Sequence, residues 1–227
     1  MRLLNSDIVY RAAYKARRIL FPPKSFLKKI PGVIHVGANT GQERSEYASL
    51  GLKVLWIEPI PTVFEVLRSN IANFPNQRAC CSLLAAEHGT KYTLHIANNG
   101  GASSSILDFS KHGAIWPEVQ FTHDVQIKAT TLARLVDTEQ IDLRSYGALI
   151  LDTQGSELMV LKGAVPILDR FKFVQAEVPD FESYAGCCQL AELTDFMRQH
   201  GFKLARKTPF ASRRGIGTYY DALYSRL

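Results

Sequence analysis

From residue 33 onward, short apolar runs alternate with segments of helical periodicity, and this alternation constrains the fold more than any other feature of the sequence. Short, almost wholly apolar runs are typical of strands that are buried on both faces of a sheet. Strands that alternate with helices favour a doubly wound α/β domain with a mostly parallel sheet covered on both faces. We therefore expect one such domain over residues 31–227.

The apolar runs and the helical segments predict the elements of this domain. We expect core strands over 33–37, 53–57, 78–84, Ala148–Leu151 and 173–176, and two closing strands over 202–205 and 219–224 that form an antiparallel edge. Two runs with a period of two, 92–96 and 124–129, predict an added hairpin-like pair. Helices are expected through 47–50, 64–71, 156–168 and 190–200.

Residues 1–30 predict a basic helical arm that precedes the domain. Apolar residues recur there at steps of three and four, eight Lys or Arg residues accompany a single acid, and Pro22-Pro23 ends the pattern. Such an arm either lies on an anionic membrane surface, packs against the domain or contacts a partner protein. No apolar run is long enough to cross a bilayer and no signal-peptide pattern is present, so we expect a cytoplasmic protein, with the arm as a candidate peripheral contact at the inner membrane surface.

The net charge of +6 is concentrated at the two ends of the chain. Residues 31–197 hold 12 basic and 19 acidic residues, whereas residues 198–227 hold seven basic residues and one acid. A nucleic-acid-binding domain usually presents its basic residues over one face of the folded core. We therefore expect no nucleic-acid partner.

The four cysteines form two adjacent pairs, Cys80-Cys81 and Cys187-Cys188, which suit neither a disulfide framework nor a zinc site and predict buried free thiols.

The segment 33–41 predicts a ligand site, because an apolar strand ends there in a glycine turn that opens a helix. Dinucleotide-binding domains require G-x-G-x-x-G at this place, so that the backbone can approach a pyrophosphate. Here the three positions are Gly37, Asn39 and Gln42, and two of the three glycines are missing. S-adenosylmethionine has no pyrophosphate, and Gly37 and Gly41 suffice for a tight turn beside its methionine part. The sequence favours S-adenosylmethionine over a nicotinamide cofactor.

Glu58 closes the next predicted strand, seventeen residues after Gly41. A carboxylate at that position lies beside the switch point of the sheet and can accept hydrogen bonds from both ribose hydroxyls. The alternative is a solvated or capping charge.

At this point the sequence resembles the FkbM family of methyltransferases over nearly all of residues 32–180. The resemblance rests on five elements in order: Val36-Gly37-Ala38-Asn39-x-Gly41; Glu58-Pro59-x-Pro61 with Phe64 and Leu67; Ser103-Ser104-Ser105; Thr131-Leu132; and Leu151-Asp152-x-x-Gly155-x-Glu157 followed by Gly163-Ala164, with Glu177 as a further echo.

The resemblance implies a seven-stranded, class I methyltransferase-like sheet and O-methylation of a hydroxyl on a sugar, glycan or secondary metabolite. It implies cofactor contacts at His35, Gly37, Ala38, Asn39, Gly41, Glu58, Ser104 and Asp152. One position departs from the family, which most often has an acid where His35 stands. This histidine either donates a hydrogen bond to the cofactor carboxylate or fills space beneath the turn.

Asp152 is the first candidate for the catalytic carboxylate, since it ends the predicted strand Ala148–Leu151 and would face the ligand crevice. It either removes the proton of the acceptor or orients it; the alternative is a cap for the loop before the next helix. Glu177 ends the following strand and is a second catalytic candidate, and His123, in a loop before the added strand, is an alternative base. Glu157 lies in the first turn of a helix, where the helix dipole alone stabilises an acid. Asp152, Glu157 and Glu177 could together bind a divalent cation, but we predict no metal site.

Three function classes compete with this prediction: a nicotinamide-dependent oxidoreductase, a nucleic-acid methyltransferase and a non-enzymatic partner-binding protein that acts through its basic arm. The loop with Lys207, Arg213 and Arg214 could attract an acidic acceptor.

Overall fold

The computed structural model describes residues 25–227, so most of the predicted arm over residues 1–30 lies outside the described residues. The elements in chain order are η1 (Ser25–Lys29), β1 (Gly32–Val36), α2 (Arg44–Ser49), β2 (Lys53–Glu58), α3 (Pro61–Ile71), β3 (Gln77–Cys81), β4 (Lys91–Ala97), α4 (His112–Ile115), β5 (Phe121–Lys128), α5 (Leu132–Thr138), η2 (Leu143–Ser145), β6 (Ala148–Leu151), α6 (Glu157–Leu168), β7 (Phe173–Pro179), α7 (Leu190–Gln199), β8 (Phe202–Arg213) and β9 (Gly217–Arg226).

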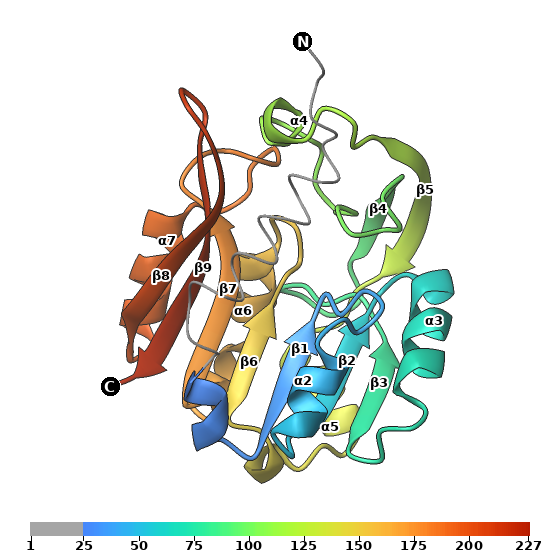
Figure 1. Cartoon of the computed structure of the whole chain (residues 1–227), viewed down its shortest axis with the longest axis vertical. Helices are drawn as coiled ribbons and strands as arrows, with labels where there is room; N and C mark the ends of the chain where they lie inside the picture. Colours follow the sequence, from blue (N-terminus) through green and yellow to red (C-terminus); the bar gives the residue numbers. More distant parts are fainter. Residues whose placement is uncertain (1–24) are drawn as a thin grey trace.

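Seven strands form one twisted sheet in the order β3-β2-β1-β6-β7-β9-β8 (Figure 1). The first five strands are parallel, and β9 pairs antiparallel with both β7 and β8. Strands β4 and β5 form a separate antiparallel pair. The predicted doubly wound sheet, its antiparallel edge and the added pair are all confirmed.

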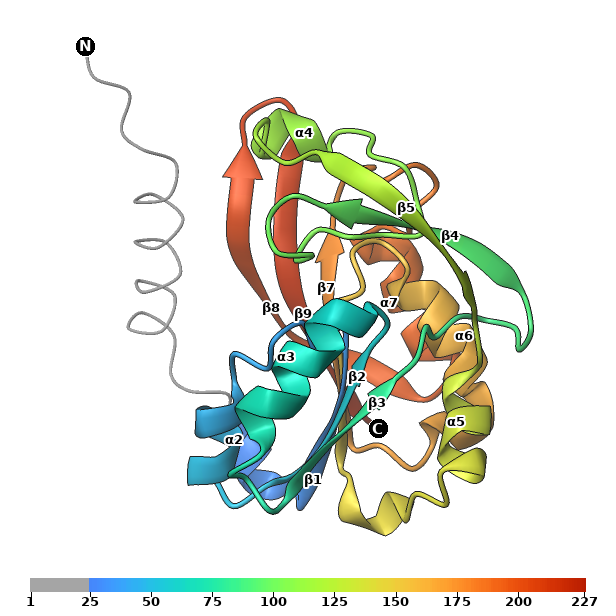
Figure 2. The same cartoon turned by 90° about the vertical axis from the view of Figure 1, so that its right-hand side faces the viewer.

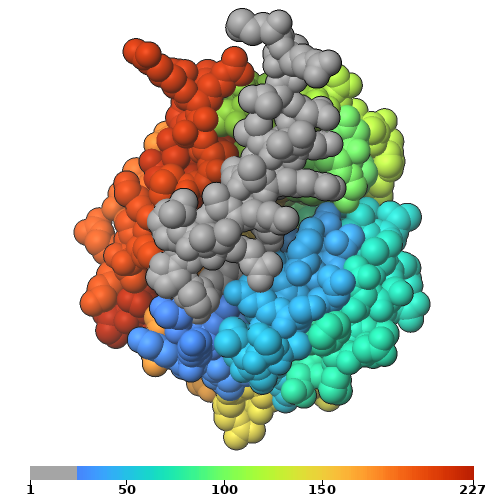
Figure 3. Space-filling view, viewed as in Figure 1, coloured from blue at the N-terminus to red at the C-terminus, as the bar shows by residue number. Residues whose placement is uncertain are grey.

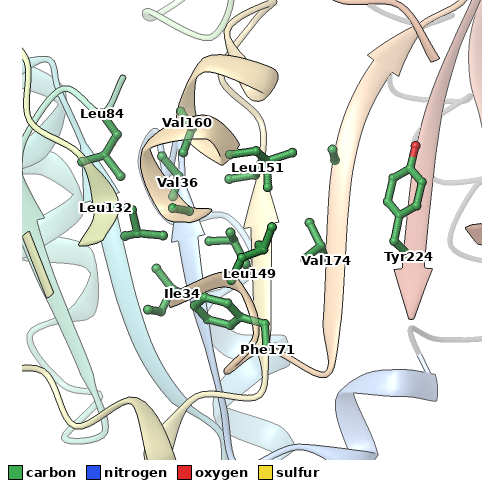
Figure 4. Close-up of a cluster of buried hydrophobic side chains, with 14 of the residues drawn as sticks. Ile34, Val36, Leu84, Leu132, Leu149, Leu151, Val160, Phe171, Val174 and Tyr224 are labelled. Atoms are coloured by element: carbon green, nitrogen blue, oxygen red, sulfur yellow. The ribbon is translucent and has the colours of Figure 1, made fainter. Parts of the chain in front are cut away.

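Successive residues of the central strands bury their side chains in two separate layers, because neighbours along a strand point to opposite faces. On one face, Ile34, Val36, Leu149 and Leu151 pack against α5, α6 and α7 (Figure 4). On the other face, the intervening residues pack against η1, α2 and α3, which lie on the opposite side of the sheet in Figure 2. Burial of each such aliphatic side chain stabilises the fold by about 1.5–3 kcal/mol.

The structure also differs from the sequence-based predictions. Helix α5 was not predicted, and Thr131 begins it by accepting a hydrogen bond from the backbone N–H of Arg134 (3.1 Å). Strand β3 ends at Cys81, and Leu83 beyond it packs with residues of the β4–β5 pair and α6, so the expected strand over 78–84 is too long. All four cysteines are free thiols as predicted, but Cys81 is exposed and Cys80 is only half-buried, so the prediction of burial is confirmed for Cys187 and Cys188 alone.

None of the helices within residues 25–227 is long and apolar enough to cross a membrane.

Candidate functional site

The candidate site lies at the edge of the sheet where β1, β2, β6 and β7 all end. These four strands run parallel, so their carboxyl ends meet at one edge. The β4–β5 pair, α4 and the tip of the β8–β9 hairpin stand above this edge in Figure 1, and the hairpin tip projects from the surface in Figure 3. Ligands of open α/β sheets bind at such an edge.

The turn after β1 has the backbone conformation that its glycines permit. Gly37 and Gly41 have φ angles of 78° and 70°, and Asn39 has a φ of 45°. A Cβ atom at Gly37 would lie 1.8 Å from the carbonyl oxygen of Asp152. Glycine is therefore required at position 37, because the turn packs directly against the end of β6.

The backbone N–H groups of this turn are engaged within the protein. Those of Gly37 and Ala38 donate to the carbonyl of Ile57, and that of Gly41 donates to the carbonyl of Ala38. The N–H of Asn39 donates to Oε2 of Glu58 (2.8 Å), and that of Thr40 donates to Oδ1 of Asn39 (2.8 Å). The turn is thus held closed by its own hydrogen bonds, and these five N–H groups do not form an anion-binding cradle of the kind that holds a pyrophosphate.

Glu58 is buried at the carboxyl end of β2, and both of its carboxylate oxygens accept a backbone hydrogen bond. Oε2 accepts from Asn39, and Oε1 accepts from the N–H of Ile60 (2.9 Å). Burial raises the pKa of Glu58 to about 7, although these two hydrogen bonds lower it, and the negative charge of Asp152 adds to the rise. A carboxylate oxygen can accept more than one hydrogen bond, so Glu58 retains capacity for ligand hydroxyls.

The loop with Ser104 lies beside the glycine turn. Nδ2 of Asn39 donates to the carbonyl of Gly100 (3.1 Å), which joins the turn to this loop. The hydroxyl of Ser104 accepts from the backbone N–H of Ala97 (3.0 Å), and the hydroxyl of Ser105 donates to the carbonyl of Gln154 (2.7 Å). The loop therefore bridges the turn after β1 and the loop after β6.

Asp152 begins the loop after β6, and Glu157 holds that loop in place. The carboxylate of Glu157 accepts hydrogen bonds from the N–H groups of Thr153 (2.8 Å) and Gly155 (3.1 Å). Burial is the main cause that raises the pKa of Glu157 to about 7, and the charge of Asp152 contributes. Glu157 thus acts on the loop backbone. Asp152 instead accepts a hydrogen bond from Nε2 of Gln154 (2.6 Å) at the surface of the site.

Glu177 lies in β7, opposite Asp221 of β9. Burial raises the pKa of the Tyr184 hydroxyl well above its usual value, and the negative charges of Glu177 and Asp152 both add to this rise. Asp152 is linked to this tyrosine through Gln154, whereas the influence of Glu177 on it is that of a nearby negative charge. His123 lies within β5, exposed and hydrogen-bonded to Thr122 (3.0 Å), so its predicted place in a loop is wrong.

With this geometry in place, the chain was compared with known proteins. The sequence profile described as Methyltransferase FkbM domain matches residues 35–204. The chain belongs to the FkbM methyltransferase family. Among curated proteins, it is 24% identical over 191 residues to the 2-O-methyltransferase NoeI of Sinorhizobium fredii, a match that covers 80% of this chain and 76% of NoeI.

Two solved structures show the same fold as this FkbM-family chain. Magnesium protoporphyrin IX methyltransferase (ChlM) from Synechocystis, with bound S-adenosylhomocysteine, aligns with a TM-score of 0.54 and 11% identity over 100% of this chain and 90% of that chain. The methyltransferase domain of METTL16 aligns with a TM-score of 0.50 and 11% identity over 85% of this chain and 58% of that chain. The sheet is that of the class I methyltransferases.

His35, where the FkbM family most often has an acid, lies on the opposite face of β1 from Ile34 and Val36. Its Nδ1 atom lies 3.2 Å from the hydroxyl of Tyr47, and its ring stacks on Trp56 at a centroid distance of 5.0 Å. These buried contacts support the space-filling alternative for His35, and a cofactor contact there remains a prediction.

An aromatic cluster stands above the site, where sequence reasoning predicted nothing. The cluster joins the region of α4 and β5 to the segment after β7 and to the start of β9. It comprises Phe109, His112, Trp116, Phe121, Tyr184 and Tyr219. Nδ1 of His112 lies 2.9 Å from the Tyr219 hydroxyl, and its Nε2 is buried without a hydrogen-bond partner among residues 25–227. Burial lowers the pKa of His112 to about 4, so the ring is neutral at pH 7.

Sequence reasoning also missed Gln154, which donates to Asp152, and Tyr184, which donates to Gln154. Both occupy positions with no periodicity, so no sequence signal points to them. Within residues 25–227, no three His, Cys, Asp or Glu side chains are arranged to hold a metal ion.

Proposed function

We propose that this FkbM-family chain uses S-adenosylmethionine to methylate a hydroxyl group on a sugar, glycan or related metabolite. The observation that carries the proposal is the buried carboxylate of Glu58 at the carboxyl end of β2, close enough to Asp152 for their charges to interact. A carboxylate at this place can accept hydrogen bonds from the two ribose hydroxyls of a nucleoside cofactor.

The residues around Glu58 fit the remaining parts of S-adenosylmethionine. Gly37 and Ala38 would lie beside its methionine part, and the loop with Ser104 beside its adenosine part, because Asn39 joins that loop to the turn. The hydrogen bonds that the N–H groups of the turn already make within the protein argue against the nicotinamide alternative. A dinucleotide needs backbone N–H groups that are free to bind a pyrophosphate, and the five from residue 37 to residue 41 are engaged.

When bound, S-adenosylmethionine supplies an electrophilic methyl group on a positively charged sulfur. Asp152 would align the acceptor hydroxyl and take its proton while the oxygen forms its bond to the methyl carbon. The carbon–sulfur bond breaks in the same step, and its electron pair neutralises the sulfur. Glu177 would contribute negative charge on the same side, because both carboxylates act on Tyr184.

A hydroxyl on a sugar is the acceptor that we favour, because a 2-O-methyltransferase is among the relatives of this chain. The aromatic cluster supplies apolar rings, of which Trp116 is half-buried, that suit the C–H face of a sugar ring. Exposed Arg213 and Arg214 at the hairpin tip would attract an acidic acceptor, and the Arg213 guanidinium ties this tip to the carbonyl of Ala114 beside the cluster. Neutral replacement of both arginines should raise the Michaelis constant for an acidic acceptor; an unchanged constant would remove this part of the proposal.

Two experiments test the proposal. Calorimetry should detect S-adenosylhomocysteine binding and no NAD binding; the reverse result would favour the oxidoreductase alternative. Transfer of tritiated methyl groups should then be measured with cell-envelope glycans, metabolite extracts and RNA as separate acceptors. We expect incorporation into the first or second, and its loss in Asp152→Asn. A fully active Asp152→Asn enzyme would exclude Asp152 as the base, and incorporation into RNA alone would contradict the acceptor class.

A further inference from the structure

A chain of hydrogen bonds runs from the aromatic cluster to the carboxylate of Asp152. The hydroxyl of Tyr184 donates to Oε1 of Gln154 (2.7 Å), and Nε2 of Gln154 donates to Oδ1 of Asp152 (2.6 Å). Tyr184 is 1% exposed and belongs to the segment after β7, whereas Gln154 and Asp152 belong to the loop after β6. Two loops that are thirty residues apart in sequence therefore meet at one carboxylate.

The order of donors and acceptors in this chain fixes the orientation of the Gln154 amide. Rotation of the amide by half a turn would place its oxygen against the carboxylate of Asp152, where two acceptors repel each other. In the observed orientation the tyrosine hydroxyl engages the amide oxygen, so the NH₂ group faces Asp152. A hydrogen bond of this kind to a carboxylate is charge-assisted and favours the ionised form.

The backbone around Gln154 is also held in an uncommon conformation. Gln154 has a φ of 53°, a left-handed angle that is unusual for a residue other than glycine. Its carbonyl accepts from the hydroxyl of Ser105 (2.7 Å), and the N–H groups on either side of it, those of Thr153 and Gly155, donate to Glu157. Strained residues that are held from several directions are concentrated at functional sites.

We infer that Gln154 is a positioning residue: anchored by Tyr184, it holds the carboxylate of Asp152 in one orientation at the crevice. The hydrogen bond from Gln154 opposes the repulsion between Asp152 and the two neighbouring acids with which its charge interacts, Glu58 from β2 and Glu157 from α6. The inference rests on the proposed function, in which Asp152 meets the acceptor hydroxyl.

The titration of Asp152 tests this inference without a known acceptor. The carboxyl carbon of Asp152 can be followed by NMR in protein labelled with ¹³C-aspartate and assigned by its loss in Asp152→Asn. Gln154→Met keeps the length of the side chain and removes the donor, so we expect the pKa of Asp152 to rise by about half a unit to one unit, the effect of one lost charge-assisted hydrogen bond. Tyr184→Phe keeps the ring and removes the anchor, and should give a smaller rise in the same direction.

Tyr224→Phe is the matched control, because Tyr224 is also buried and its hydroxyl is also hydrogen-bonded to a side chain, that of Thr194 (3.0 Å), but Tyr224 pairs with the start of β7. It should leave the titration of Asp152 unchanged. If Gln154→Met and Tyr184→Phe, both folded, leave the pKa of Asp152 at its wild-type value, the inference is wrong. Calorimetry of the wild-type protein with S-adenosylhomocysteine tests the proposed function separately. If the wild type does not bind this ligand, the proposed function fails, whereas the effect of Gln154 on the pKa of Asp152 can still be observed.

Discussion

The backbone N–H of Asn39 donates to the carboxylate of Glu58 across 2.8 Å, which joins the turn after β1 to the end of β2. One buried side chain thereby closes the glycine turn and lines the crevice in which we place the cofactor. The same carboxylate accepts from Ile60 at the start of α3, so the turn after β1, the end of β2 and the start of α3 converge on it. A substitution of Glu58 should therefore alter ligand binding more than the same substitution of an exposed acid in β2 or α3.

Glu58→Gln should weaken the binding of S-adenosylhomocysteine about tenfold to a hundredfold. The amide has one acceptor oxygen where the carboxylate has two, and its NH₂ group would face a backbone N–H or a ribose hydroxyl. Calorimetry measures the effect. Glu65→Gln, on the exposed surface of α3 beside Arg68, is the matched control and should bind as the wild type does. Equal affinities for the two variants would contradict the ribose role of Glu58.

The affinity for S-adenosylhomocysteine should depend on pH through Glu58. Its pKa is raised to about 7, chiefly by burial, so the carboxyl is largely neutral at pH 6 and largely ionised at pH 8. If the ionised form accepts the ribose hydroxyls, binding should be about tenfold tighter at pH 8 than at pH 6, in proportion to the competent fraction. This dependence should vanish in Glu58→Gln. A flat profile for the wild type would show that the ionised form is not required.

Glu157→Ala should lower the free energy of unfolding by about 2–4 kcal/mol, because it removes the buried acceptor of the N–H groups of Thr153 and Gly155 in a half-buried loop. Glu192→Ala is the control: Glu192 also lies in the first turn of a helix, α7, but is exposed, and its removal should cost at most about 1 kcal/mol. Urea denaturation compares them. Equal losses would mean that Glu157 acts only through the helix dipole.

Gly37→Ala and Gly51→Ala separate backbone strain from close packing. Both glycines have a positive φ, 78° and 68°, but a Cβ at Gly51 would meet no atom within 4 Å, whereas one at Gly37 would overlap the carbonyl of Asp152. We expect a loss of about 1 kcal/mol for Gly51→Ala and of more than about 3 kcal/mol for Gly37→Ala. Thermal unfolding of both variants measures this, and similar losses would contradict the close contact between the β1 turn and β6.

The sequence predicted the sheet well because its strands are local apolar runs. Ala148–Leu151 was predicted with its observed bounds, since four apolar residues lie between polar turns. Helix α5 was missed, because its seven residues form too short a periodic segment beside the preceding strand. Strand β8 extends to Arg213, well past the predicted end at residue 205, since most of its later residues are polar and are ordered by pairing with β9.

The candidate site was predicted less completely, because its geometry depends on contacts between distant residues. Gly37, Glu58 and Asp152 were identified by their places at strand ends, and the structure brings them to one edge of the sheet. The hydrogen bonds from Tyr184 to Gln154 and from Gln154 to Asp152 had no sequence signal, since Tyr184 lies in an irregular segment. The hydrogen bonds that close the turn were equally hidden, because their acceptors lie in β2.

A crystal structure of the protein with S-adenosylhomocysteine tests the central claim most directly. We predict that both ribose hydroxyls lie within hydrogen-bond distance of the Glu58 carboxylate, with the sulfur on the side of Asp152. A nucleoside bound away from β2, or a ribose without contact to Glu58, would contradict the assignment of this crevice as the cofactor site.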